Sequence, residues 1–184
     1  GIHRECLRTN IAIKPTHLGL ALDEELAYEN VAALAAHAAG LGNFVRMDME
    51  DSPCTDPTLA VYYRLHEQYE NLGIVIQARL RRTINDARGL AKVKANVRVC
   101  KGIYIEPYAI SYNDPEIIRD NFTTLVDQLM SAGCYVAVAT HDERLVWSSE
   151  QTIRRLGLGP EQYEFQMLLG VLPDLRNVVK ASGH

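Results

Sequence analysis

Polar side chains recur at one end of short apolar segments along the whole chain. Six such segments end in a group that carries charge or forms directed hydrogen bonds, namely Lys14, Asp48, Gln77, Arg98 with Lys101, Thr140 with His141, and Gln166. Lysine and arginine suit the negative charge of a carboxylate or a phosphate, while amides and hydroxyls add directional bonds. The set therefore suits an anionic small molecule together with an organic cofactor.

The segments that carry these groups have the length and composition of strands. Apolar, β-branched runs predict strands at 11–14, 44–49, 73–77, 97–101, 135–140 and 163–167. Longer stretches with helical periodicity predict helices near 24–39, 57–71, 81–95, 115–132, 143–156 and 171–182. Asp56-Pro57 and Asp114-Pro115 each place an acid before a proline, which is typical of a helix start.

Strands that alternate with helices throughout a chain are parallel and are joined by helical crossovers. An open sheet would gather its polar strand ends at one switch point, whereas a barrel places the ends of all strands around one mouth. Polar groups on every strand favour the barrel. We therefore predict an α/β fold of the parallel (β/α)8 TIM type, with about six βα repeats present in one domain over residues 1–184.

Side chains alternate between the two faces of a strand, and here the faces differ in chemistry. Arg46 and Asp48 share one face, and Arg98 shares a face with Cys100, whereas the intervening residues are apolar. We expect the ionisable groups inside the barrel and the apolar groups against the helices. For any one residue, an interior ion pair that only stabilises the barrel is the alternative. Because every strand contributes a polar group at the same end, the whole set favours a binding site.

The composition and the motifs disfavour several classes of protein. With 19 Lys and Arg against 23 Asp and Glu, the net charge of −4 disfavours nucleic acid as a partner. The sequence has no glycine-rich dinucleotide motif, P-loop, H-E-x-x-H or G-x-S-x-G, and no residues at metal-ligand spacing, so we predict no metal. The four cysteines form no C-x-x-C pair and favour a reducing compartment.

Six segments resemble the strand motifs of the proline dehydrogenases, in the order of that family. They are residues 11–14, 45–51, 73–78, 97–102, 139–142 and 163–168. The similarity covers nearly the whole chain and is nearest to the short bacterial, single-activity branch. It implies FAD-dependent oxidation of L-proline to Δ1-pyrroline-5-carboxylate in proline catabolism, with electrons passed to a membrane quinone. It also implies a cytoplasmic enzyme. Two further options are peripheral contact with the inner membrane and a homo-oligomer.

The resemblance also implies roles for individual residues. Asp48 and Arg98 would be catalytic, and Lys14, Tyr104 and Leu168 would bind the substrate. The residues implied to hold FAD are Met49, Gln77, Arg98, Lys101, Gly102, Ile103, Thr140, His141 and Gln166. A fixed guanidinium suits the Arg98 role, because hydride transfer puts negative charge on a flavin and arginine does not lose its proton.

The chain is shorter than the roughly 250 residues of a complete barrel. The resemblance implies that the family's first strand and helix precede residue 1 and that its last strand and helix follow residue 184. The family's last helix carries a paired arginine that grips the substrate carboxylate, and neither Arg81-Arg82 nor Arg154-Arg155 has that position. Two alternatives stay open: an inactive or fragmentary barrel, and a Schiff-base lyase with Lys14 or Lys101 as nucleophile.

Overall fold

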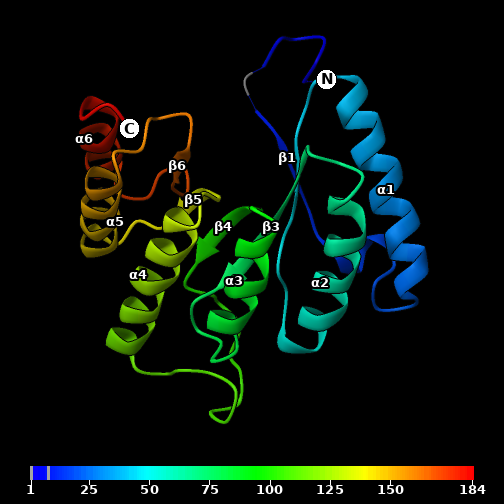
Figure 1. Cartoon of the computed structure of the whole chain (residues 1–184), viewed down its shortest axis with the longest axis horizontal. Coiled ribbons are helices and arrows are strands. Elements are labelled where there is room, and N and C mark those ends of the chain that lie inside the picture. Colours follow the sequence, from blue (N-terminus) through cyan, green and yellow to red (C-terminus); the bar gives the residue numbers. More distant parts are fainter. Residues whose placement is uncertain (1, 8) are drawn as a thin grey trace. The chain divides into compact units, whose positions relative to one another are not determined.

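The computed structural model describes residues 2–7 and 9–184, in which strands and helices alternate (Figure 1). The strands are β1 (Ile11–Ile13), β2 (Val45–Met47), β3 (Leu72–Gln77), β4 (Asn96–Cys100), β5 (Tyr135–Ala139) and β6 (Tyr163–Gln166). The helices are the 3₁₀ helix η1 (Pro15–Leu18) and the α-helices α1 (Glu24–Gly40), α2 (Ser52–His66), α3 (Thr83–Lys92), α4 (Pro115–Ser131), α5 (Glu143–Leu156) and α6 (Pro173–Ala181). The strands hydrogen-bond in chain order, as in a TIM-type barrel, so the predicted fold class with six βα repeats is confirmed.

All six predicted strands are present, but one predicted helix start is wrong. Asp114 does begin α4, since its carboxylate accepts hydrogen bonds from the backbone N–H groups of Glu116 at 2.7 Å and Ile117 at 3.3 Å. In contrast, α2 begins after Asp51, and Pro57 lies inside the helix. The earlier sequence Asp51-Ser52-Pro53 carries the same start signal, an acid followed by a proline in the first turn, and the helix uses that one.

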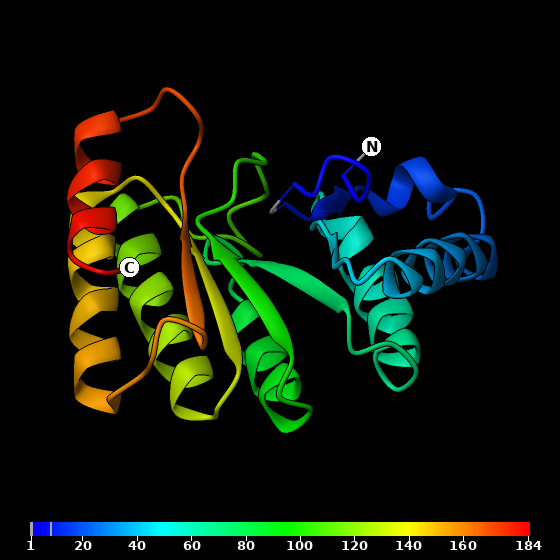
Figure 2. The ribbon, with the colours of Figure 1, turned by 90° about the horizontal axis from the view of Figure 1, so that it is seen from above.

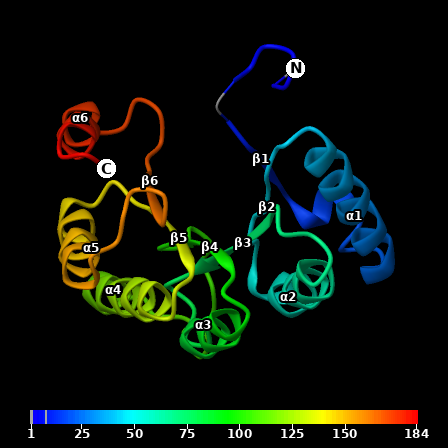
Figure 3. The same ribbon diagram turned by 45° about the horizontal axis from the view of Figure 1, so that its top comes forward.

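The chain forms two compact units, one that ends at Val75 and one that begins at Ile76. In unit 1, β1 pairs with β2 and β2 with the first part of β3, all in parallel. The helices α1 and α2 cover one side of these strands (Figure 3). Their fully buried apolar residues are Ala27, Val31, Ala35, Met47, Val61, Tyr62, Leu65, Leu72 and Ile74. The single-domain organisation over residues 1–184 stays a prediction.

In unit 2, β4 pairs with β5 and β5 with β6, again in parallel. The helices α3, α4 and α5 lie on one side of these strands (Figure 2). Val97 and Val99 of β4 are fully buried on that side. The alternating residues Arg98 and Cys100 are partly exposed. The predicted division into an apolar face against the helices and a polar face away from them is therefore confirmed for β4.

The helices of unit 2 hold this sheet through an apolar interface. Phe122, Leu125 and Leu129 of α4 recur at helical spacing, and each is fully buried. Leu145 of α5 is fully buried as well. The strand ends of unit 2 are thus fixed from the helix side, and their polar groups lie on the other face or beyond the strands. Among the residues that the structure describes, no helix has the length and apolar character needed to cross a membrane.

Candidate functional site

The strand register of unit 2 sorts the predicted site residues into rows. Ala137 of β5 has Arg98 on one side and Glu164 on the other, and Ala139 has Cys100 and Gln166 in the same way. Partners in a parallel register point to the same face, so Arg98 and Gln166 share the face away from the helices. Gln166 donates a hydrogen bond to Glu164 at 2.6 Å, which ties the two polar residues of β6 together.

Asp142 connects the ends of β4 and β5 through charged hydrogen bonds. Its Oδ2 accepts from Nζ of Lys101 at 2.5 Å and from Nε of Arg119, a residue of α4, at 2.7 Å. The backbone N–H of Asp142 donates to Oγ1 of Thr140 at 3.1 Å. Its Oδ1 accepts from the backbone N–H of Arg144 at 3.2 Å and so caps the start of α5. One residue therefore connects two strand ends and two helices through its side chain and its backbone.

The two cations keep Asp142 ionised. Burial raises the pKa of its carboxyl, but the hydrogen bonds from Lys101 and Arg119 outweigh this effect and lower the pKa to about 2. The same hydrogen bond from Arg119 to Asp142, followed by the attraction between their charges, raises the pKa of Arg119. Arg119 also pairs with Glu116, and Glu116 pairs with Arg144. Charges of alternating sign thus run from the end of β4 to the start of α5.

Gly102 lies against Gln77 at the end of β3. The ladder between the two chain segments continues past the strands, because the N–H groups of Ala78 and Arg79 donate to the carbonyls of Cys100 and Lys101, both at 2.8 Å. Gly102 has a φ of +95°, and a Cβ added there would lie 2.6 Å from Oε1 of Gln77. Only glycine fits this approach without a shift of Gln77, whose side chain is 3% exposed.

The segment between β4 and α4 is anchored from the β3–α3 connection. NH1 of Arg79 donates to the carbonyl of Tyr104 at 3.5 Å, and Nε of Arg81 donates to the carbonyl of Tyr108 at 3.2 Å. The Arg81 guanidinium also lies 5.2 Å from the ring centroid of Tyr108 and 4.5 Å from that of Tyr112. These contacts hold the backbone that carries Gly102 and Tyr104.

The remaining predicted residues of unit 2 differ in exposure. Thr140 is buried, whereas His141 is exposed. Ile103 and Leu168 have exposed fractions of 86% and 67%, so they lie at the surface of this unit. Tyr104 is half-buried.

Three predicted residues lie in unit 1. Lys14 follows β1 in an extended conformation, with φ −98° and ψ 119°, and Pro15 ends the strand and begins η1. Asp48 follows β2 and is half-buried, and its N–H donates to the carbonyl of Ile13 at 2.8 Å. Lys14 and Asp48 thus follow neighbouring strands of the same pair, in the row beyond Ile13 and Met47. Met49 is buried.

Glu50 holds η1 beside the end of β2. Its carboxylate accepts from the backbone N–H of Thr16 at 2.9 Å and from the Thr16 hydroxyl at 2.7 Å. The turn that follows Lys14 is therefore tied to the segment that carries Asp48 and Met49. The convergence of these unit 1 groups with Gln77 and Arg98 stays a prediction.

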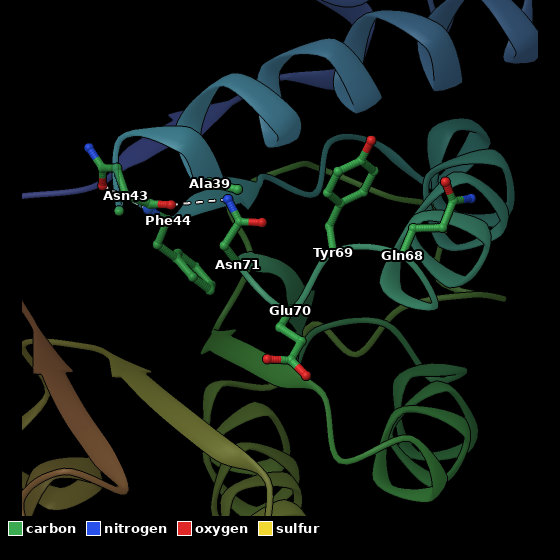
Figure 4. A pocket seen from close by; sticks show the side chains of 8 residues that line it. Ala39, Asn43, Phe44, Gln68, Tyr69, Glu70 and Asn71 are labelled. Carbon is green, nitrogen blue, oxygen red and sulfur yellow. Dashed lines mark hydrogen bonds between the residues drawn. The ribbon is translucent and has the colours of Figure 1, made fainter.

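Unit 1 also contains a pocket of about 450 Å³ at the opposite ends of its strands. The lining residues are Ala39, Gly42, Asn43, Phe44, Gln68, Tyr69, Glu70 and Asn71 (Figure 4). Asn71 donates to the carbonyls of Asn43 and Ala35, both at 3.0 Å, which joins the loops before β2 and β3. In β/α barrels chemistry takes place at the carboxyl ends of the strands. We therefore assign the pocket to loop packing.

Sequence reasoning gave no role to Asp142, Arg119, Arg79 and Arg81, although Asp142 lies in the motif at 139–142. Asp142 follows Thr140-His141 directly and precedes a helix, which is the signal of a capping residue beside a strand end. Arg119 gave no signal, because it lies within a helix, and its sequence position does not show which strand end it reaches. In the part of the chain that the structure describes, no group of three or more His, Cys, Asp or Glu side chains could hold a metal ion.

Known proteins resemble this chain in sequence and in fold. The family model of proline dehydrogenase matches residues 3–184. Proline dehydrogenase of Deinococcus radiodurans is 34% identical over 187 residues, which cover 99% of this chain and 60% of that protein. Proline dehydrogenase 1 of Bacillus subtilis is 34% identical over 178 residues, 97% of this chain and 59% of that protein. The chain thus spans about 60% of the length of these relatives.

Solved structures of proline utilization A have the same fold. The protein from Bdellovibrio bacteriovorus, inactivated by N-propargylglycine, superimposes with a TM-score of 0.86 at 22% identity, over 95% of this chain and 21% of that one. The protein from Corynebacterium freiburgense gives a TM-score of 0.81 at 21% identity, over 92% of this chain and 21% of that one. These likenesses support the barrel architecture.

Proposed function

The chain belongs to the proline dehydrogenase family, and on that premise we propose that it contributes most of the barrel of an FAD-dependent enzyme that oxidises L-proline to Δ1-pyrroline-5-carboxylate. The main structural support for this proposal comes from the contacts at the strand ends of unit 2. There Gln77 lies against Gly102, and Lys101 and Thr140 are joined through Asp142. Such a set offers an amide and a cation to one flat, anionic cofactor.

The residues of unit 2 fit FAD in shape and in charge. Gly102 has no side chain, so the amide of Gln77 packs directly against the backbone that follows β4, next to Lys101. Lys101 is 38% exposed, so its ammonium can reach a phosphate while it is held by Asp142. We propose that Gln77, Lys101 and Gly102 hold the cofactor together with Ile103, Thr140, His141, Gln166 and, from unit 1, Met49. When bound, FAD supplies a two-electron acceptor for the oxidation of proline.

We propose roles in the reaction itself for five residues. Arg98 provides a fixed positive charge beside the cofactor, where it stabilises the negative charge that the reaction produces. Lys14 binds the proline carboxylate, with Tyr104 and Leu168 as further substrate contacts. Asp48 is the acid of the site, on the strand end next to Lys14. The proposed final electron acceptor is a membrane quinone.

The lyase alternative is disfavoured by the contact of Lys101. A Schiff base requires a neutral amine that can attack a carbonyl. The Lys101 ammonium instead donates a hydrogen bond to Asp142 at 2.5 Å and forms an ion pair with it. Lys101 is therefore suited to bind an anionic group and poorly suited to act as a nucleophile.

The test uses the purified protein, its flavin absorption and the reduction of a dye by proline. We expect a yellow protein that reduces the dye. Arg98→Met and Asp48→Asn should bind FAD and lose at least about a hundredfold in rate, because each removes a charge at the reacting groups. Arg88→Met is the control, since Arg88 is exposed on α3 and contacts Asn85. A well-folded, colourless protein would overturn the proposal.

A further inference from the structure

We propose that Asp142 is a positioning residue, whose carboxylate holds Lys101 in place for a phosphate of the dinucleotide cofactor. This inference deepens the proposed function and rests on it. Asp142 itself does not need to touch the cofactor. Its effect passes through Lys101, the first residue after β4 and one of the residues that we assign to cofactor binding.

The two carboxylate oxygens of Asp142 have separate partners. Oδ1 accepts a hydrogen bond from the backbone N–H of Arg144 at 3.2 Å and so caps α5. Oδ2 accepts from the side chains of Lys101 at 2.5 Å and Arg119 at 2.7 Å. A residue that only started a helix would need the first contact alone. The second set of contacts is directed at a cation on the neighbouring strand end, which a capping role does not require.

Lys101 needs such an anchor because its side chain is long and flexible. Its ammonium carries three N–H donors, and the bond to Asp142 occupies one of them. The side chain is 38% exposed, so the other donors can reach an anion outside the protein. An ammonium that is already held in place loses less conformational freedom when it binds a phosphate.

Arg119 lets Asp142 hold Lys101 without cancelling the positive charge of the strand ends. Both cations share the same oxygen of Asp142, so one carboxylate faces two positive groups. Thr140 fixes the same residue from the other side, through its hydroxyl and the Asp142 backbone N–H. Thr140 thus holds the backbone of Asp142 and Arg119 of α4 holds its carboxylate, which makes Asp142 a rigid support for Lys101.

Asparagine separates the two roles of Asp142. It is as good a helix cap as aspartate, through the same Oδ1 position, but its amide nitrogen cannot accept hydrogen bonds from Lys101 and Arg119. We expect Asp142→Asn to raise the dissociation constant for FAD about tenfold, measured by quenching of flavin fluorescence on titration. Asp142→Ser also retains a capping oxygen without charge, and we expect the same result from it.

A double-mutant cycle shows whether the effect passes through Lys101. Lys101→Met should weaken FAD binding at least as much as Asp142→Asn, and the double variant should bind no more weakly than Lys101→Met alone. Asp114→Asn is the matched control, because Asp114 caps α4 by the same kind of contact and is exposed. Its dissociation constant should stay within about twofold of the wild-type value.

Each other outcome contradicts the inference. If Asp142→Asn and Asp142→Ser bind FAD as the wild type does, the residue is a helix cap only, and the proposed function is unaffected. If they bind FAD more tightly, the carboxylate only repels the phosphate. Additive effects in the cycle would show that Lys101 is not the intermediary. A wild-type protein that binds no FAD would overturn the proposed function, and this inference with it.

Discussion

Gly102 shows at the scale of one residue how conformation and packing combine. Its φ of +95° is the left-handed region, and the position of its missing Cβ is taken up by the side chain of Gln77. Any other residue at this position would be strained and would also collide with Gln77. Both effects fall on a residue to which we assign cofactor binding.

We expect Gly102→Ala to destabilise the protein by about 2–3 kcal/mol and to weaken FAD binding, because strain and displacement of Gln77 add. Denaturant unfolding and flavin titration measure the two effects. Gly133→Ala is the matched control, since Gly133 has a φ of +81° and nothing within 4 Å of an added Cβ. It should lose only about 1–2 kcal/mol from backbone strain and leave FAD binding unchanged. Equal losses in the two variants would refute the packing argument.

Asp142 makes the stability of the protein sensitive to acid. Burial raises the pKa of its carboxyl, but the hydrogen bonds from Lys101 and Arg119 lower it to about 2, below the ordinary value of 3.8. A group whose pKa is lowered on folding stabilises the native state above the ordinary pKa, and this contribution is lost as the pH falls toward the lowered value.

The contribution of Asp142 should therefore be complete at pH 7 and should disappear between about pH 4 and pH 2. After allowance for solvent screening, we expect it to be about 1 kcal/mol. The measurement compares the free energy of unfolding of the wild type and Asp142→Asn at pH 7 and at pH 3. The difference between the two proteins should shrink on acidification, and a difference that stays constant would exclude the ion pairs as its source.

At the scale of elements, the connection between β4 and α4 depends on contacts from the preceding connection. Arg81 lies near the rings of Tyr108 and Tyr112 and donates to the Tyr108 carbonyl. Its backbone N–H donates to the carbonyl of Ile110 at 2.9 Å. The exposed apolar residues Ile103 and Ile105 in this connection contribute little burial of their own. Arg81 is therefore a principal anchor.

We expect Arg81→Met to keep the backbone bonds and lose the cation–π and carbonyl contacts, which together contribute about 1–2 kcal/mol to local order. Hydrogen exchange of residues 102–112 should become faster by about tenfold, while α4 keeps its protection. Arg88→Met, on the exposed face of α3, should change neither region. Unchanged exchange in residues 102–112 would show that the backbone bonds alone hold the connection.

Secondary structure also shows where a local signal is ambiguous. The segment 51–57 contains two places at which an acid is followed by a proline, and both satisfy the pattern of a helix start. The helix begins at the earlier one, at Ser52, and tolerates Pro57 inside it. The choice adds a turn whose Thr55 is buried in unit 1. Burial against the rest of the unit, which a short sequence window does not contain, decides between two equal signals.

At the scale of the whole molecule, the residues proposed to bind substrate and cofactor belong partly to one unit and partly to the other. Lys14, Asp48 and Met49 lie in the unit that ends at Val75, and the other predicted site residues lie in the unit that begins at Ile76. The chain spans about 60% of the length of its relatives. Variants that test the proposed reaction therefore come from both units, whereas the proposed cofactor contacts of Lys101, Gly102 and Gln77 involve residues of unit 2 alone.

The sequence by itself determined the alternation of strands and helices, the polar face of β4 and the family. These depend on periodicity and on motifs, which are local properties of a chain. Only the tertiary structure decided which side chains meet. The contacts of Lys101 and Arg119 with Asp142 join residues 41 and 23 positions apart, and the contact of Gly102 with Gln77 joins two strand ends. Such pairs form when β-strands and helices pack, and their free energy depends on distances that no stretch of sequence contains.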